Sequence, residues 1–274
     1  MKTSFFILIF TTAVHCMGVS QTIIEGYVKD KQTQSAVAYV NIGIVGKNTG
    51  TVSRTDGWFR LSIEDMFRDD TLRFSMIGYK SYTVKVADAL QKFTNPATVF
   101  MEMEAVKLNE VIVTGKPLKR AVLGNRTEST IVQAGFTSNE LGNEVGIAIK
   151  IKKKPTYIER FNIFISDNTY DTLKFRINIY SLKDGLPSEN LMPQPVVVFT
   201  TLKKGRLSID LSKYNIIVTD NIFASLEWIE DLGKSGLYFS ASLGGSPVIA
   251  RHTSQGKWEK VGPVSLGINL DVKY

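Results

Sequence analysis

Cysteine and histidine are nearly absent from this chain of 274 residues. It has one cysteine, Cys16, and two histidines, His15 and His252. Zinc fingers, iron–sulfur proteins and disulfide-stapled domains each need several Cys or His side chains, so all three classes are excluded. Hydrophobic residues still make up 43% of the sequence, which is enough for a real core. We predict a folded protein with no metal site and no cofactor.

Charge is sparse at the N-terminus, where Lys2 is the single charged residue among the first twenty. The apolar run 5–10 follows it, and small residues lead up to Ser20. This order is typical of a secretory signal peptide, and the run is shorter than the roughly 20 apolar residues of a membrane-spanning helix. We therefore expect residues 1–20 to be removed and the mature chain to begin at Gln21.

Export would set the location of the protein, and cleavage would determine which residues the mature chain keeps. Cys16 would leave with the signal peptide, and we do not expect its lipidation because His15 stands where a lipidated cysteine has a small residue. Without Lys2 the mature chain has 32 basic and 26 acidic residues, a mild net charge of +6. In an exported protein this balance argues against nucleic acid and leaves anionic glycans or lipid head groups as electrostatic partners. We expect a location in the periplasm, at the outer membrane or at the cell surface, with membrane association open but no transmembrane helix.

Long apolar stripes with a helical period are also missing from the mature chain. Short segments of alternating apolar and polar residues recur instead, separated by turn residues, and they predict β-strands throughout. Phe59, Leu61 and Ile63, for example, alternate with more polar neighbours. We expect an all-β protein with a seven-stranded sandwich over residues 21–105 and a jelly-roll-like β-sandwich over residues 128–274.

The predicted strands follow from this alternation. Those of the first domain are 22–28, 37–45, 51–54, 58–63, 71–76, 81–86 and 98–103, with a tight hairpin at Asp56-Gly57. Those of the second domain are 128–136, 144–152, 157–166, 173–181, 195–201, 206–210, 215–218, 221–230, 236–243 and 264–274, with a loop at 183–187. Residues 106–127 contain Pro, Gly and basic residues at a density typical of an exposed linker.

Four short phrases follow one another in the first domain: GYV at 26–28, AYVNI at 38–42, TVSRTDGWF at 51–59 and FSMIGY at 74–79. Together they resemble the carboxypeptidase-like regulatory domain, a transthyretin-like module of envelope proteins in Bacteroidota-type bacteria. The resemblance covers residues 22–105 and implies a seven-stranded, prealbumin-like sandwich in an exported protein. It implies no peptidase activity, because this domain carries no peptidase residues.

The segment 108–115 is similar to the stretch that follows this domain in starch-utilisation-type TonB-dependent receptors, where it resembles a TonB box. About 160 residues follow Gly115, too few for a plug and a 22-stranded barrel. The resemblance therefore implies a retained joint, or a strand that adds to the sheet edge of a partner, rather than a receptor.

Catalytic signatures are weak. His252, the single histidine of the expected mature chain, has no Gly-x-Ser-x-Gly elbow to accompany it. Glu227 and Glu230 are close in sequence but face opposite sides of a strand, so a glycosidase pair would need a carboxylate from elsewhere. The run 167–171 is rich in Asp and Asn but lacks the spacing of an EF-hand loop. We predict no catalytic residue and no enzyme activity.

Ligand binding has one candidate residue, Trp258. It lies among turn residues and charges, so it is the aromatic residue that we expect to be exposed and available for stacking against a sugar. The leading hypothesis is a non-enzymatic exported envelope protein. Its first domain would be a rigid spacer, and its second would bind a glycan, a protein or another envelope component through loops and sheet edges.

Two alternatives stay open. The run 266–274 alternates and ends in an aromatic residue, so the C-terminal region could form a small outer-membrane β-barrel. Against this, several predicted strands are shorter than the roughly ten residues of a barrel strand, and the stretches 152–155 and 193–195 fit loops. The second alternative is a hydrolase that acts on polysaccharide, whose signature would be a convergent carboxylate pair in a cleft.

Overall fold

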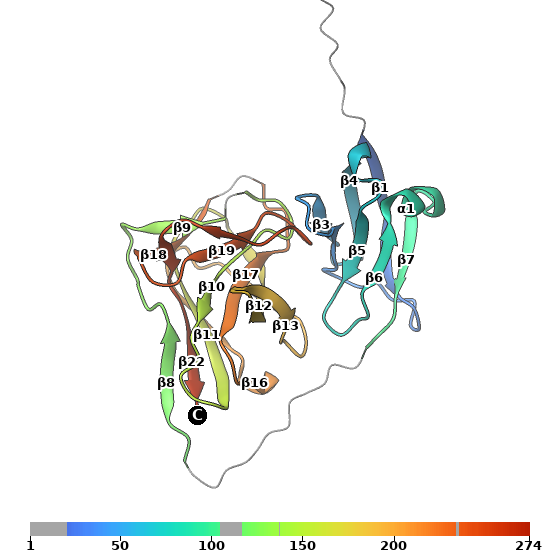
Figure 1. Ribbon diagram of the computed structural model, residues 1–274. Helices are drawn as coiled ribbons and strands as arrows, with labels where there is room; N and C mark the ends of the chain where they lie inside the picture. Colours follow the sequence, from blue (N-terminus) through green and yellow to red (C-terminus); the bar gives the residue numbers. More distant parts are fainter. Residues whose placement is uncertain (1–20, 105–116, 137, 234–235) are drawn as a thin grey trace, which may run out of the picture.

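The chain forms two β-rich domains, which lie beside each other in Figure 1. The computed structural model describes residues 21–104, 117–136, 138–233 and 236–274. The expected signal peptide with Cys16, and the segment 108–115, lie outside the described residues. None of the described helices combines the length and the apolar character that crossing a bilayer requires. The predicted all-β fold class is confirmed.

The N-terminal domain packs a three-stranded sheet, in the order β4-β1-β7, against a four-stranded sheet, in the order β3-β2-β5-β6. The strands are β1 (Gln21–Asp30), β2 (Asn41–Ile44), β3 (Gly50–Val52), β4 (Trp58–Glu64), β5 (Thr71–Ser75), β6 (Tyr82–Lys85) and β7 (Ala97–Met101). Phe59, Leu61 and Ile63 of β4 point into the core between the sheets, where Phe59 meets Phe74 edge to face at 5.4 Å. The predicted seven-stranded sandwich is confirmed.

Two local features of this domain differ from the prediction. The turn at Asp56-Gly57 forms, but it carries the chain from β3 in one sheet to β4 in the other instead of closing a hairpin within one sheet. A short helix, α1 (Val86–Lys92), follows β6 and buries Val86 and Ala89. Its seven residues are too few to show a helical period in the sequence, which is why alternation alone missed it.

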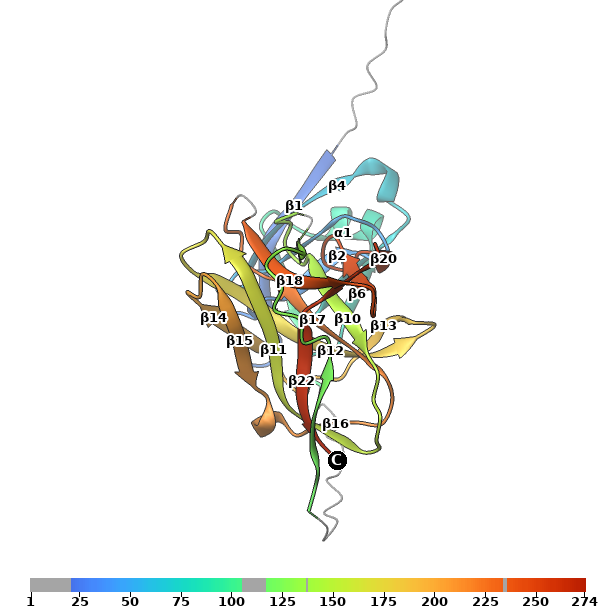
Figure 2. The same ribbon diagram turned by 90° about the vertical axis from the view of Figure 1, so that its left-hand side faces the viewer.

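The second domain also consists of two sheets. The seven-stranded sheet has the order β13-β12-β17-β10-β19-β20 with β14 paired to β12, and the eight-stranded sheet has the order β21-β18-β11-β22-β8 with β15, β16 and β9 at its margins. Figure 2 faces the eight-stranded sheet, with β22 between β11 and β8. Phe161 and Leu270 from this sheet meet Phe175 and Leu226 from the other in one apolar core. The second domain is therefore a β-sandwich, as the leading hypothesis predicted.

The strand bounds of this domain are close to the predicted ones. They are β8 (Arg120–Gly124), β9 (Gln133–Gly135), β10 (Glu144–Ile149), β11 (Thr156–Asn168), β12 (Leu173–Lys183), β13 (Leu186–Asn190), β14 (Val196–Thr200), β15 (Gly205–Asp210), β16 (Ile216–Val218), β17 (Ile222–Trp228), β18 (Leu237–Leu243), β19 (Val248–Arg251), β20 (Glu259–Val261), β21 (Val264–Leu266) and β22 (Ile268–Lys273). Short helical turns occur at η1 (Asp65–Phe67) and η2 (Ser212–Tyr214).

Several strands lie where the sequence predicted none. β8 falls inside the expected linker 106–127, yet it pairs with β22 and buries Leu123. β13 occupies the end of the loop predicted at 183–187, where Asp184 and Gly185 both adopt positive φ and close a hairpin. Pro187 is compatible with β13 because this strand lies at the edge of its sheet. β19 and β20 were also not expected.

Candidate functional site

The two domains meet through the loop 253–256, which joins β19 to β20. Ser254 donates a hydrogen bond to the side-chain oxygen of Asn41 at 3.0 Å, and Gln255 donates one to Ser75 Oγ at 2.7 Å. A Cβ atom placed on Gly50 of β3 would lie 2.2 Å from the carbonyl oxygen of Ser254. Glycine at this position therefore allows the backbones of the two domains to touch.

Four charged side chains form one row across the outer face of the seven-stranded sheet, beneath this contact. Arg176 of β12 lies opposite Glu227 of β17, Glu227 lies opposite Glu144 of β10, and Glu144 lies opposite Arg251 of β19. Their sequence neighbours point to the core, so alternation directs this row outward. The row places two carboxylates between two guanidinium groups.

Short hydrogen bonds connect the four side chains of the row. Arg176 Nη2 lies 2.7 Å from a carboxylate oxygen of Glu227, and Arg251 Nη2 lies 2.7 Å from one of Glu144 and 3.2 Å from the other oxygen of Glu227. Asn178 donates to both carboxylates at 2.9 Å, and Tyr180 donates to Glu144 at 3.2 Å. Both glutamates have no exposed surface.

This environment shifts the two carboxyl pKa values in opposite directions. Burial raises the pKa of Glu144, and the neighbouring charge of Glu227 adds to that effect. Burial alone would also raise the pKa of Glu227, but Arg176 and Arg251 outweigh it and hold that pKa below its ordinary value. The two arginines therefore favour the ionised form of Glu227 more strongly than that of Glu144.

The row also links the domains. Arg176 donates to the carbonyl oxygen of Tyr39 at 2.8 Å and to the side-chain oxygen of Asn41 at 2.9 Å, and both residues belong to the N-terminal domain. Arg73 of β5 donates from Nε to the side-chain oxygen of Gln255 at 2.6 Å. Polar contacts between charged or amide groups thus hold the joint.

An open cavity of about 370 Å³ lies beside this joint. Its volume falls within the range of about 300–1,000 Å³ that is usual for small-molecule sites. Both domains contribute to its walls, which contain three arginines, four amides and three aromatic residues that bear polar groups: Arg73, Arg176, Arg251, Asn41, Asn178, Asn190, Gln255, Tyr79, Tyr180 and Trp258. We call this cavity the interdomain cleft. Among the described residues, no aspartate or glutamate lines it.

Trp258, the residue predicted as a ligand contact, lines the interdomain cleft but is half-buried. Its ring packs against Phe223 at 5.2 Å and Tyr180 at 5.8 Å, and the guanidinium carbon of Arg251 lies 4.9 Å from its centroid. The expectation of an exposed ring was wrong, because β19 and β20 fold this stretch back onto an apolar patch of the sheet.

The other residues weighed from the sequence do not join this site. Glu230 lies beyond the end of β17 and pairs with Lys174 at 2.6 Å. Lys174 and Arg176 share one face of β12, so the prediction that Glu227 and Glu230 face opposite sides was wrong. Asp171 lies on the surface beside Lys203. Within the described ranges, no group of three or more His, Cys, Asp or Glu residues is arranged to hold a metal. His252 lies next to the row but does not line the cleft.

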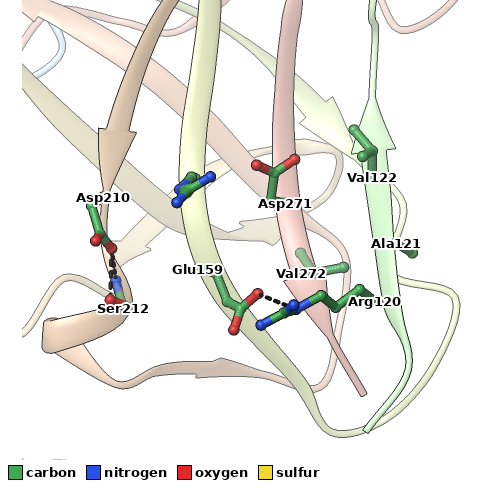
Figure 3. Close-up of a pocket in the computed structure, with 9 residues that line it drawn as sticks. Arg120, Ala121, Val122, Glu159, Asp210, Ser212, Asp271 and Val272 are labelled. Atoms are coloured by element: carbon green, nitrogen blue, oxygen red, sulfur yellow. Dashed lines mark hydrogen bonds and ion pairs between the residues drawn. The ribbon is translucent and has the colours of Figure 1, made fainter.

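A second pocket, of about 520 Å³, lies on the outer face of the eight-stranded sheet (Figure 3). Asp210, Arg160 and Asp271 lie opposite one another there on three neighbouring strands. Arg120 reaches Glu159 at 3.4 Å. Hydrogen bonds from the Ser212 hydroxyl and backbone N–H to Asp210 lower the pKa of that carboxyl. The walls of this second pocket carry both signs of charge.

Comparison with known proteins identifies the first domain. Residues 24–113 match the family model of the CarboxypepD_reg-like domain. The N-terminal domain is a CarboxypepD_reg-like domain. The match ends at residue 113, past the boundary expected at 105. The predicted resemblance is thereby confirmed, and its four phrases map to the strands that build the sandwich.

No curated protein matches the chain. Among solved structures, the chain is similar to the crystal structure of the cysteine protease and lectin-like domains of Cwp84, a surface layer associated protein of Clostridium difficile. The alignment covers 92% of this chain at 9% identity, with a TM-score of 0.42. The chain spans 58% of the length of that structure.

Proposed function

We propose that the protein is a non-enzymatic binding or adaptor protein of the cell envelope. After export it would bind a glycan, a protein or another envelope component, and the interdomain cleft would be its binding site. The observation that carries the proposal is the closed row of Arg176, Glu227, Glu144 and Arg251. The four charged groups form ion pairs with one another, and Arg176 also bonds to the N-terminal domain. The open cleft beside them is lined by neutral hydrogen-bonding groups, aromatic rings and arginines.

The same row bears on the hydrolase alternative. Glu144 and Glu227 are the convergent carboxylate pair that a glycosidase would need, and Glu144 is the partner that sequence spacing could not supply. Both side chains are fully buried and engaged by arginine and asparagine. A general acid must lie within hydrogen-bond reach of the bond that it protonates. This placement therefore supports a structural role for the pair and a binding role for the cleft.

A glycan array tests the proposal with two matched Ser→Trp variants. Ser188 is exposed and lines the interdomain cleft, whereas Ser212 is exposed and lines the second pocket. We expect Ser188→Trp to fill the cleft and abolish glycan binding, and Ser212→Trp to leave binding unchanged. Loss of binding by Ser212→Trp alone would assign the site to the second pocket instead.

A chromatographic assay for new reducing ends tests the absence of catalysis. We expect none when the purified protein is incubated with the polysaccharides that it binds. Products formed by the wild-type protein and absent with Glu144→Gln would overturn the non-enzymatic proposal and make the buried pair the candidate catalyst.

A further inference from the structure

The interdomain cleft carries more positive charge than the carboxylates around it neutralise. Arg176 and Arg251 are paired with the two buried glutamates, but Arg73 has no carboxylate within ion-pair distance among the described residues. The Arg73 Nε–H group donates instead to the neutral amide oxygen of Gln255. Burial lowers the pKa of Arg73, and repulsion from Arg251 adds to this effect. The half-buried Arg73 guanidinium thus faces a second cation.

Arg251 gives a second, independent indication. Its side chain is 9% exposed and lines the cleft. Its Nη2 atom contacts both glutamates, while its buried Nε–H group has no hydrogen-bond partner within the described part of the chain. A buried donor left without a partner costs about 1–3 kcal/mol, and more for a charged group. Arg251, which lines the cleft, thus keeps hydrogen-bonding capacity that the two glutamates do not use.

The remaining walls indicate what carries the anion. Asn41 and Asn190 present amide groups, Ser81 and Ser188 present hydroxyl groups, and Tyr79 adds an aromatic ring whose hydroxyl bonds to Asp30. Neutral donors and acceptors of this kind suit a ligand with many hydroxyl groups. Guanidinium groups suit carboxylate, sulfate and phosphate groups, whose oxygens they can bind in pairs.

We propose that the interdomain cleft binds an acidic saccharide, with the anionic group at Arg73 and Arg251 and the sugar hydroxyls at the amide and serine side chains. This inference rests on the proposed binding function and narrows it to one ligand class. A neutral sugar would leave the two cations facing each other, and a small free anion would leave the neutral walls unused.

Isothermal titration with the purified protein tests the proposal, using an oligomer of galacturonic acid, the matching neutral galactose oligomer, a sulfated galactose oligomer and inorganic phosphate as probes. We expect an acidic oligomer to bind at least about tenfold more tightly than the neutral one, because a charged hydrogen bond is worth about that factor or more. We also expect its affinity to fall as salt rises. The two acidic oligomers distinguish carboxylate from sulfate as the preferred group.

Three variants locate the interaction. Arg73→Gln should lose about tenfold in affinity for the acidic oligomer, and Arg73→Lys should retain most of it. Arg120→Gln, the matched change in the second pocket, should have no effect. Thermal melting of each variant confirms that it is folded. Equal binding of acidic and neutral oligomers by the wild-type protein, or full affinity in a folded Arg73→Gln variant, would overturn the acidic-saccharide proposal.

The outcomes with Ser188→Trp, Arg73→Gln and phosphate distinguish failure of this inference from failure of the proposed function. Binding that Ser188→Trp abolishes but Arg73→Gln leaves intact would keep the cleft as the site and refute the anionic ligand. Binding that neither Ser188→Trp nor Arg73→Gln alters would refute both. Inorganic phosphate bound as tightly as the acidic oligomers would refute the saccharide part, since the sugar would then contribute nothing.

Discussion

The sharpest test of the buried row is the substitution Glu227→Gln. Glu227 has no exposed surface and lies between Arg176 at 2.7 Å and Arg251 at 3.2 Å. Removing its charge leaves two buried guanidinium groups with Glu144 as their remaining carboxylate, and burial raises the pKa of Glu144. Breaking a buried ion pair on one side costs about 3–5 kcal/mol because the partner charge stays uncompensated. We expect a loss of that size in the free energy of unfolding.

Urea denaturation at pH 7, followed by tryptophan fluorescence, measures this loss. Trp228 and Trp258 both lie near the row, so their emission reports on its unfolding. The melting temperature should fall by about 10 °C, since 1 kcal/mol corresponds to about 2–4 °C in a protein of this size. Glu102→Gln is the matched control, because Glu102 and its partner Lys31 are both largely exposed and their pair should contribute at most about 1 kcal/mol.

A double-mutant cycle uses Arg176→Leu, Glu227→Leu and the variant that combines them. Replacing both partners by apolar groups removes the unpaired charge, so the double variant should lose less stability than the sum of the two single variants. A loss below 1 kcal/mol in Glu227→Gln, or strict additivity in the cycle, would show that the row is solvated or dispensable. The reasoning about buried charge would then be wrong.

Four further predictions concern the two glutamates, the domain contact at Gly50 and the mature N-terminus. Glu227 has a lowered pKa, so its contribution to stability is full above its unfolded pKa of 4.5 and is lost as the pH falls through its lower folded pKa. Urea midpoints measured between pH 7 and pH 3 should therefore fall less steeply in Glu227→Gln than in the wild type. Glu144 has a raised pKa, so its contribution to stability is present below pH 4.5 and is lost as the pH rises through its folded pKa. Glu144→Gln mimics the protonated form, so at pH 7 it should lower the free energy of unfolding less than Glu227→Gln does. An equal or larger loss would refute the assignment of charge. Gly50→Ala should destabilise the protein by about 1–3 kcal/mol in thermal melting, because the new methyl group would lie 2.2 Å from the Ser254 carbonyl oxygen; an unchanged melting temperature would mean that the domains do not touch there. Intact-mass analysis of the protein secreted by its host should give a chain that begins at Gln21, and retention of residues 1–20 would contradict the predicted signal peptide.

Local patterns predicted most of the strands because their cause is local. Phe59, Leu61 and Ile63 alternate with polar residues, and the side chains of a strand alternate between its faces. The same pattern could not reveal β8, whose strand character depends on pairing with β22 at the far end of the chain. The stretch before it, with Gly115, Pro117 and several lysines, looks like a linker until the partner strand is known.

The candidate site could not be read from the sequence for a related reason. Arg176 and Glu227 are 51 residues apart, and Glu227 and Arg251 are 24 apart. They become neighbours because the sheet order β12-β17-β10-β19 is not the chain order. Glu144 stands at the start of a predicted strand without any nearby charge to suggest a role. Trp258 was the one cleft residue with a local signal, and that signal predicted more exposure than it has.

The position of the interdomain cleft changes the role expected for the first domain. The sequence predicted a spacer, with binding left to the second domain. The cleft instead takes Arg73 and Tyr79 from the CarboxypepD_reg-like domain, and Asn190 and Arg251 from the second sandwich. Gln255 contacts Arg73 in the wall of the cleft and also belongs to the loop that joins the domains. Neither domain encloses the cleft by itself, so docking of the two domains and formation of the cleft are one structural event.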